Sequence, residues 1–276
     1  MQSSNPVLNR LGQAAGQGRS QVQPPPSFGA PTGYGYPQSG YGVPPQAGAT
    51  RAMTIDDVVT RTVGLLFVTG IFGAAAWTLL PDTGAVTGIA LFGSLIAGLV
   101  LGLVISFTQV TNPAVIIPYA ALQGVLLGVV SRWYEHAFNG IVIQAVIGTF
   151  GIFAIMAVLY KLQILRATPR FTKMVIGALV GVVVLSLANF IFYLFGLNLG
   201  LRDYGTEGKV GWLPIVFSLV IIVVAALTFV LDFDAVEQGV RQGLPEKFAW
   251  YCAFGILVGL IFLYWEILRM LSYLRR

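Results

Sequence analysis

Three carboxylates stand out because they lie within or at the end of long apolar runs. Glu266 is inside the run of residues 248–272, and Asp232 and Asp234 end the run before it. An ionised side chain is costly in hydrocarbon, so such residues are rare and usually face a protein interior or an aqueous cavity. These three side chains are therefore the first candidates for a functional site.

The surroundings of Glu266 allow two interpretations. Arg269 lies three residues further along the same predicted helix, and Glu266 could form an ion pair with it, or with a base from another helix, that holds the last helix in place. Alternatively, Glu266 lies near Asp232 or Asp234 across the bundle core. Two carboxylates that share a low-dielectric site do not both ionise cheaply, so the pair would hold a proton near physiological pH and release it as pH rises.

A carboxylate pair would also attract cations. Carboxylate oxygens are hard ligands that suit Ca²⁺, so Glu266 and Asp234 could bind it transiently, in competition with protons. Asp232 and Asp234 point about 200° apart on a helix, because successive residues are separated by about 100°. At most one of them faces the bundle interior squarely, and the sequence leaves open which one pairs with Glu266.

The elements that would position these residues are transmembrane helices. The 276 residues are 56% hydrophobic and 10% charged, whereas soluble globular proteins carry about 25% charged residues. Seven apolar segments are long enough to cross a bilayer, and none alternates as a barrel strand does. The composition therefore predicts an all-α polytopic membrane protein, with spans near residues 62–80, 85–107, 114–131, 141–160, 171–195, 212–231 and 248–274.

Local signals refine this organisation. Thr54 can cap a short interfacial turn at residues 54–61, before the first span. The pairs Gly124/Gly128 and Gly177/Gly181 are small residues four apart, which predict close helix packing.

The first part of the chain differs in composition from the rest. Residues 1–52 are rich in Pro, Gly, Tyr and Gln and show no apolar period, which predicts a disordered tail before a transmembrane domain at residues 53–276. The tail could dock membrane protein partners through its Tyr-Gly and Pro-Pro elements. The sequence does not predict the oligomeric state.

Basic residues predict the orientation. The loop between the fourth and fifth spans holds Lys161, Arg166, Arg170 and Lys173 and no acid, so we expect it and the N-terminus in the cytoplasm. Seven crossings would place the C-terminus outside, against the preference of Arg275 and Arg276. We favour seven crossings over a re-entrant last segment.

Other function classes find no support in the sequence. The net charge of +5 arises mainly from residues that flank apolar runs, so we expect the lipid bilayer and not nucleic acid as the partner. One histidine excludes a multi-histidine metal site, and no hydrolase, protease or nucleotide-binding motif is present. We expect no enzymatic activity and no cofactor, with Ca²⁺ as a possible permeant ion.

Three stretches are similar to one known family. They are YAALQGVLLG at residues 119–128, the segment Ile141–Lys161, and the pair LDFDAVEQG and LIFLYWEILRMLSYL that carries the three acids. Over residues 54–276 the chain resembles the Bax inhibitor-1 (transmembrane Bax inhibitor motif, YccA-like) family, in a branch of actinobacterial type with a disordered N-terminal tail.

The resemblance implies a seven-helix bundle, in a bacterial inner membrane, with a central last helix that the other six surround. It also implies a pH-sensitive passive Ca²⁺ leak, in which Glu266 and Asp234 or Asp232 act as the proton sensor. Glu266 replaces the usual Asp, and the second span has no counterpart of the arginine that family members can use to hold the sensor closed. The alternative is a non-conducting membrane protein that modulates a membrane protease or an envelope complex.

Overall fold

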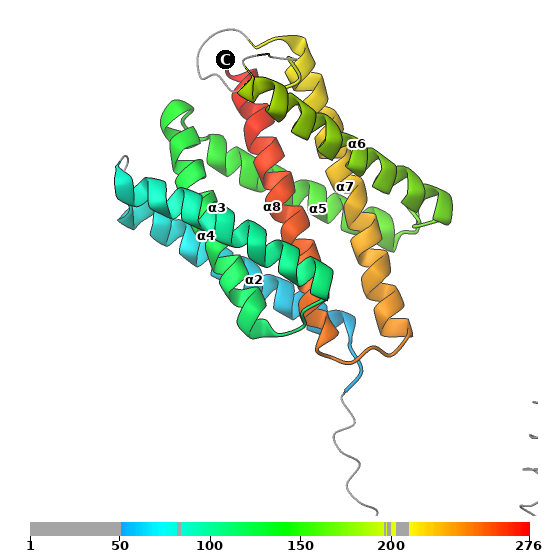
Figure 1. Ribbon diagram of the computed structural model, residues 1–276. Coiled ribbons are helices and arrows are strands. Elements are labelled where there is room, and N and C mark those ends of the chain that lie inside the picture. Colours follow the sequence, from blue (N-terminus) through cyan, green and yellow to red (C-terminus); the bar gives the residue numbers. More distant parts are fainter. Residues whose placement is uncertain (1–50, 82–83, 196, 198–199, 203–209) are drawn as a thin grey trace, which may run out of the picture. The chain divides into compact units, whose positions relative to one another are not determined.

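The computed structural model describes residues 51–81, 84–195, 197, 200–202 and 210–276. Over these residues it is all-helical, and seven helices are long and apolar enough to cross a membrane, as the sequence predicts (Figure 1). The predicted disordered tail lies outside the described residues, apart from Arg51 and Ala52. The helices are α2 (Ile55–Leu79), α3 (Ala85–Thr108), α4 (Pro113–Ala137), α5 (Ile141–Lys161), α6 (Pro169–Leu194), α7 (Trp212–Arg241) and α8 (Phe248–Leu274).

The start of α2 is fixed by a capping box. The Thr54 hydroxyl accepts a hydrogen bond from the Asp57 backbone amide, and the Asp57 carboxylate accepts one from the Thr54 amide. The helix then runs without a break into the first span, so the expected separate turn at residues 54–61 is the first part of α2. Just before it, Ala52 forms an antiparallel bridge with Pro245, which ties the chain to the α7–α8 connection.

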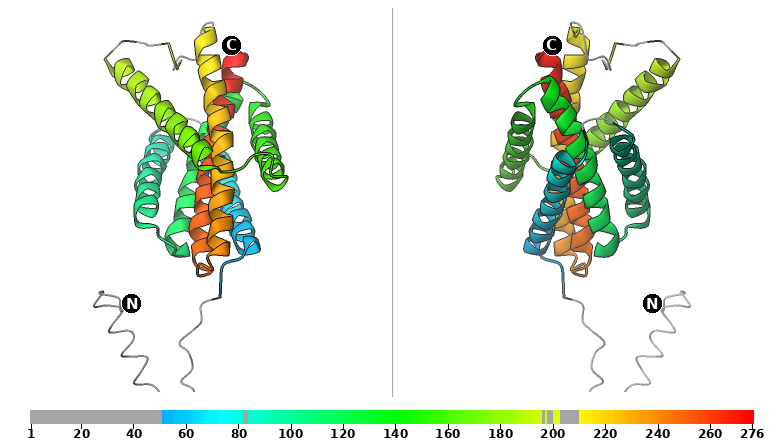
Figure 2. Two further views of the ribbon diagram at one scale, coloured as in Figure 1. Left: turned by 90° about the vertical axis from the view of Figure 1, so that its right-hand side faces the viewer. Right: turned by 90° about the vertical axis from the view of Figure 1, so that its left-hand side faces the viewer.

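The last helix is the centre of the bundle. α8 packs directly on α2, α4, α5 and α7, whereas α3 packs on α4 and α6 packs on α7 at the periphery. Two views at right angles to Figure 1 show α8 and α7 side by side, with α3 and α6 on one outer side and α5 on the other (Figure 2). α8 is therefore central as predicted, although four helices surround it directly and not six.

Close packing of α2 on α4 rests on the two glycines of α4. A Cβ built at Gly124 would lie 2.4 Å from the Thr69 carbonyl oxygen, and one at Gly128 would lie 2.3 Å from that of Gly73. Only glycine permits this approach, as the spacing predicts. The second pair, Gly177 and Gly181, behaves differently: a Cβ there meets nothing within 4 Å, so the predicted close packing is wrong for α6.

The helices alternate in direction along the bundle. Their ends lie in turn at the lower right and at the upper left of Figure 1, so α2 begins and α8 ends at opposite ends of the domain. This arrangement agrees with seven crossings. α7 continues ten residues past the expected span end at 231, and both Asp232 and Asp234 are therefore helical.

Candidate functional site

Glu266 lies inside the bundle near the C-terminal end of α8. Its exposed fraction is 1%, and it is among the largest fully buried side chains of the domain. Arg269, one turn further along α8, donates a hydrogen bond from Nη1 to Glu266 Oε1 over 3.0 Å. The structure thus brings together Glu266 and the arginine that its own helix offers.

A second arginine reaches the same carboxylate oxygen from another part of the chain. Arg202 lies in the connection between α6 and α7, and its Nη2 donates to Glu266 Oε1 over 3.1 Å. The same nitrogen lies 3.1 Å from the Ser186 hydroxyl of α6, and the guanidinium lies over the Phe217 ring of α7 at 5.7 Å. Arg202 therefore joins α6 and α7 to the central helix at one point.

The ion-pair cluster is asymmetric. Both guanidinium groups contact Oε1, whereas the buried Oε2 of Glu266 has no hydrogen-bond partner among the described residues, and neither does Nε of Arg202. A buried carboxylate oxygen without a partner is costly, because it has lost its water without compensation. Oε2 is therefore the atom of this cluster at which a proton would gain most.

Asp232 and Asp234 do not meet Glu266. The register of α7 on α8 is fixed by Phe229, whose ring lies 2.9 Å from a Cβ built at Gly259. From that contact, Glu266 lies seven residues further along α8. Asp232 and Asp234 lie three and five residues further along α7, which runs in the opposite direction. At about 1.5 Å per residue, the two aspartates lie roughly 15 and 18 Å below Glu266 along the bundle. Asp234 instead accepts a hydrogen bond from Gln238 over 2.5 Å.

An aromatic layer lies between the level of Glu266 and the level of Asp232 and Asp234 along the bundle. Phe229 is fully buried against Gly259, and Phe153 of α5 meets its ring edge-on at 5.1 Å. Phe233 continues the stack, with a ring centroid 5.6 Å from that of Phe153. These aromatic side chains therefore lie between the level of Glu266 and the level of the aspartates.

Sequence reasoning did not identify Arg202. Its position between the fifth and sixth spans resembles that of any charged loop residue, and an acid follows it directly at residue 203. The one available signal was that the second span has no counterpart of the arginine that family members can use to hold the sensor closed, so that a base from another part of the chain could take its place. No spacing rule connects two residues 64 positions apart.

The described residues contain no group of three or more His, Cys, Asp or Glu side chains arranged to hold a metal ion. Glu266 and Asp234 are too far apart to share one ion in this conformation.

A family model, described as Bax inhibitor 1 like, matches residues 5–276. The chain belongs to the Bax inhibitor 1 like family. The match includes nearly the whole chain, with the seven helices and the Glu266 cluster inside it. No curated protein matches the chain. The chain is therefore a multi-pass membrane protein of the Bax inhibitor 1 like family.

Proposed function

We propose that this Bax inhibitor 1 like protein is a passive, pH-sensitive leak for Ca²⁺ or other cations, with Glu266 as its gate. One observation carries the proposal: a fully buried carboxylate on the central helix is held by two arginines through a single oxygen. Intramembrane ionisable residues of this kind mark ion pathways and proton relays more often than inert packing.

The ion pairs give the direction of the pH response. The Arg202–Glu266 contact exists only while Glu266 is ionised, and it fastens the α6–α7 connection to α8. A proton on Oε2 would cancel the charge that holds Arg202, and a long guanidinium side chain can then move toward the aqueous surface. Lower pH therefore favours release of the cluster and a higher rate of leak.

The positions of Glu266 on α8 and of Asp232 and Asp234 on α7 suit a cation path along these two helices. Glu266 lies toward one end of the bundle, and Asp232 and Asp234 lie toward the other, half-buried, with the Phe229 layer between them. The aspartates would concentrate cations at their end, and the aromatic layer would block them until the helices move. In this proposal the aspartates act as ligands for the permeating ion, and the pH sensor is Glu266 with its arginines.

We further propose the inner membrane of a bacterium of actinobacterial type, within the YccA-like branch, as the location. The exposed bases Lys161, Arg166, Arg170 and Lys173 gather at the end of the bundle where α2 begins, which favours that end as cytoplasmic. Glu266 and Arg202 then lie toward the outer side and sense the external pH.

The test measures Ca²⁺ flux against pH in proteoliposomes that contain the full chain. We expect flux to rise as pH falls, and Glu266→Gln to remove the pH dependence and keep flux high. Asp232→Asn with Asp234→Asn should lower the flux without moving its pH midpoint. The matched control is Glu246→Gln, because Glu246 is also an acid paired with an arginine, Arg61, but lies on the α7–α8 connection.

Two results would overturn the proposal. An unchanged pH dependence in the Glu266→Gln variant would remove Glu266 as the gate. If wild-type protein shows no flux at any pH, the leak is refuted, and the non-conducting role with a membrane protease or envelope partner becomes the function to pursue. Deletion of residues 1–50, where the predicted docking elements lie, then tests that role.

A further inference from the structure

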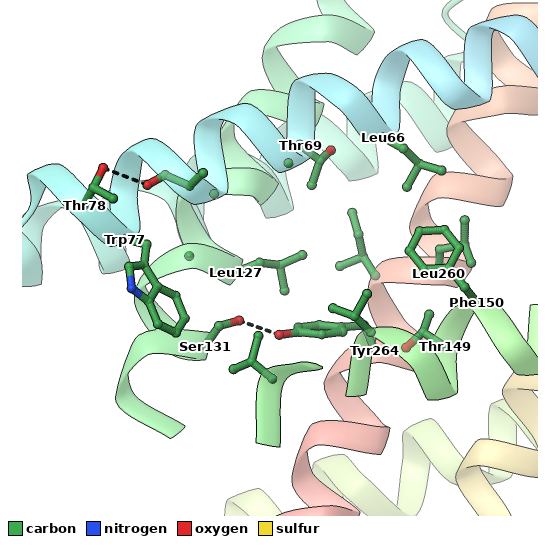
Figure 3. Close-up of a pocket in the computed structure, with 17 residues that line it drawn as sticks. Leu66, Thr69, Trp77, Thr78, Leu127, Ser131, Thr149, Phe150, Leu260 and Tyr264 are labelled. Atoms are coloured by element: carbon green, nitrogen blue, oxygen red, sulfur yellow. Dashed lines mark hydrogen bonds between the residues drawn. The ribbon is translucent and has the colours of Figure 1, made fainter. Parts of the chain in front are cut away.

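A long apolar groove separates α2 from α5. These two helices both pack on α8, and two cavities lie between them, an upper one of about 520 Å³ and a lower one of about 650 Å³. The cavities share Leu66 of α2 and Phe150 of α5 as lining residues, so they are adjacent, and together they form the α2–α5 groove. Figure 3 shows the upper cavity, with Leu66 and Trp77 on one side and Tyr264, bonded to Ser131 over 2.6 Å, on the other.

The groove opens toward the membrane. Val59 and Val63, which line the lower cavity, are 54% and 47% exposed in the domain. Both valines belong to α2 and face hydrocarbon when the bundle is in a bilayer. The occupant of the groove must therefore be apolar along most of its length and must be able to enter from the side.

The dimensions exclude a partner helix and fit one acyl chain. A helix of about 10 Å diameter along the roughly 27 Å from Val59 to Trp77 would need about 2,000 Å³, which is more than the cavities of about 520 and 650 Å³ hold together. The lower cavity follows α2 from Ile55 to Leu66, which is about 16 Å. One leaflet of the hydrocarbon core is about 15 Å thick, so the cavity has the length of a single lipid tail.

Positive charge gathers where the lower cavity ends. Lys161 and Gln163 line its mouth, and Arg166 and Arg170 follow in the α5–α6 connection, all of them exposed and with no acid between residues 161 and 173. Glu237 also lines the lower cavity, but its carboxylate is already bound by Tyr160 and Arg241. A phosphate group at the mouth would thus meet Lys161 and the exposed bases that follow it.

We propose that the lower part of the α2–α5 groove binds one tail of an anionic phospholipid whose head group contacts Lys161. The tail lies between Val63 of α2 and Ala157 of α5, and the glycerol backbone lies at the level of Lys161 and Gln163. The site is separate from the Glu266 cluster, and the proposal does not depend on ion conduction.

The experiment measures phospholipid binding to delipidated full-length protein in detergent. Phosphatidylglycerol and phosphatidylcholine with identical tails are the probes, read by native mass spectrometry and by the shift in melting temperature. We expect one phosphatidylglycerol per chain to bind at least tenfold more tightly than phosphatidylcholine. Ala157→Phe and Val63→Trp fill the groove from opposite walls, and each should weaken binding of both lipids at least tenfold.

Matched variants distinguish an effect on the groove from the general effect of adding a bulky side chain or removing a base. Val183→Trp places the same bulk on an exposed α6 position that lines neither cavity, and it should bind like the wild type. Lys161→Gln should remove the preference for phosphatidylglycerol and keep binding of the tail, whereas Lys173→Gln should keep the preference.

Three results would overturn the proposal. The first is wild-type binding of phosphatidylglycerol by correctly folded Ala157→Phe and Val63→Trp. The second is equal binding of the two lipids by the wild type. The third is a change in oligomeric state alone in Val63→Trp, which would assign the groove to a second copy of the chain. A variant that fails to fold is replaced by the one on the opposite wall.

Discussion

The contribution of the two arginines to stability should differ strongly, although their distances to Glu266 are nearly equal at 3.1 and 3.0 Å. The difference arises in the unfolded state, against which the stability of the bundle is measured. Helices of a membrane protein persist when the bundle comes apart, so a pair within α8 survives unfolding, whereas a pair between α8 and a distant connection does not. The Arg269 pair is three residues apart on one helix, and the Arg202 pair is 64 residues apart.

The structure sets the size of the effect. The Arg202 and Glu266 side chains are 11% and 2% exposed, so solvent screens their contact little. A hydrogen bond to a charged partner contributes about 1.5–3 kcal/mol, which we expect as the coupling energy of Arg202 with Glu266. A pair at i, i+3 on one helix contributes about 0.2–0.5 kcal/mol, which we expect for Arg269.

Two double-mutant cycles measure these couplings. Each cycle combines Glu266→Gln with Arg202→Gln or with Arg269→Gln, and the free energy of unfolding is read from denaturation of the purified protein in mixed micelles. Each single variant leaves one buried charge without its partner. The cycle subtracts this cost, so the coupling energy contains only the interaction between the two side chains. A coupling for Arg269 equal to or larger than that for Arg202 would refute the argument from the unfolded state.

Three further predictions concern packing. Gly128→Ala should destabilise the domain by about 1–3 kcal/mol or more because its Cβ meets the α2 backbone, whereas Gly64→Ala, with open space around it, should leave the melting temperature nearly unchanged. Tyr264→Phe should cost about 1 kcal/mol in thermal unfolding, through loss of its buried hydrogen bond with Ser131. Phe229→Ala should cost about 3–5 kcal/mol and raise cation flux at all pH values, since it opens the aromatic layer; unchanged flux would argue against that layer as a barrier.

Much of the fold followed directly from the sequence. Hydrocarbon leaves the backbone no alternative to helices, so each apolar run of bilayer length predicts a span, and all seven predicted spans are helices. The Gly124/Gly128 spacing identified a true contact. The same spacing at Gly177 and Gly181 did not, because a motif shows that close approach is permitted but not that a partner helix lies there.

The sequence by itself determined that Glu266 is exceptional, because a carboxylate in an apolar run is costly whatever the fold. It did not determine the partner. The tertiary structure decided that, because the register of Phe229 on Gly259 places Asp232 and Asp234 at another level of the bundle. The path of the α6–α7 connection brings Arg202 to the carboxylate instead. Register and loop path depend on packing across the whole bundle, and no local pattern encodes them.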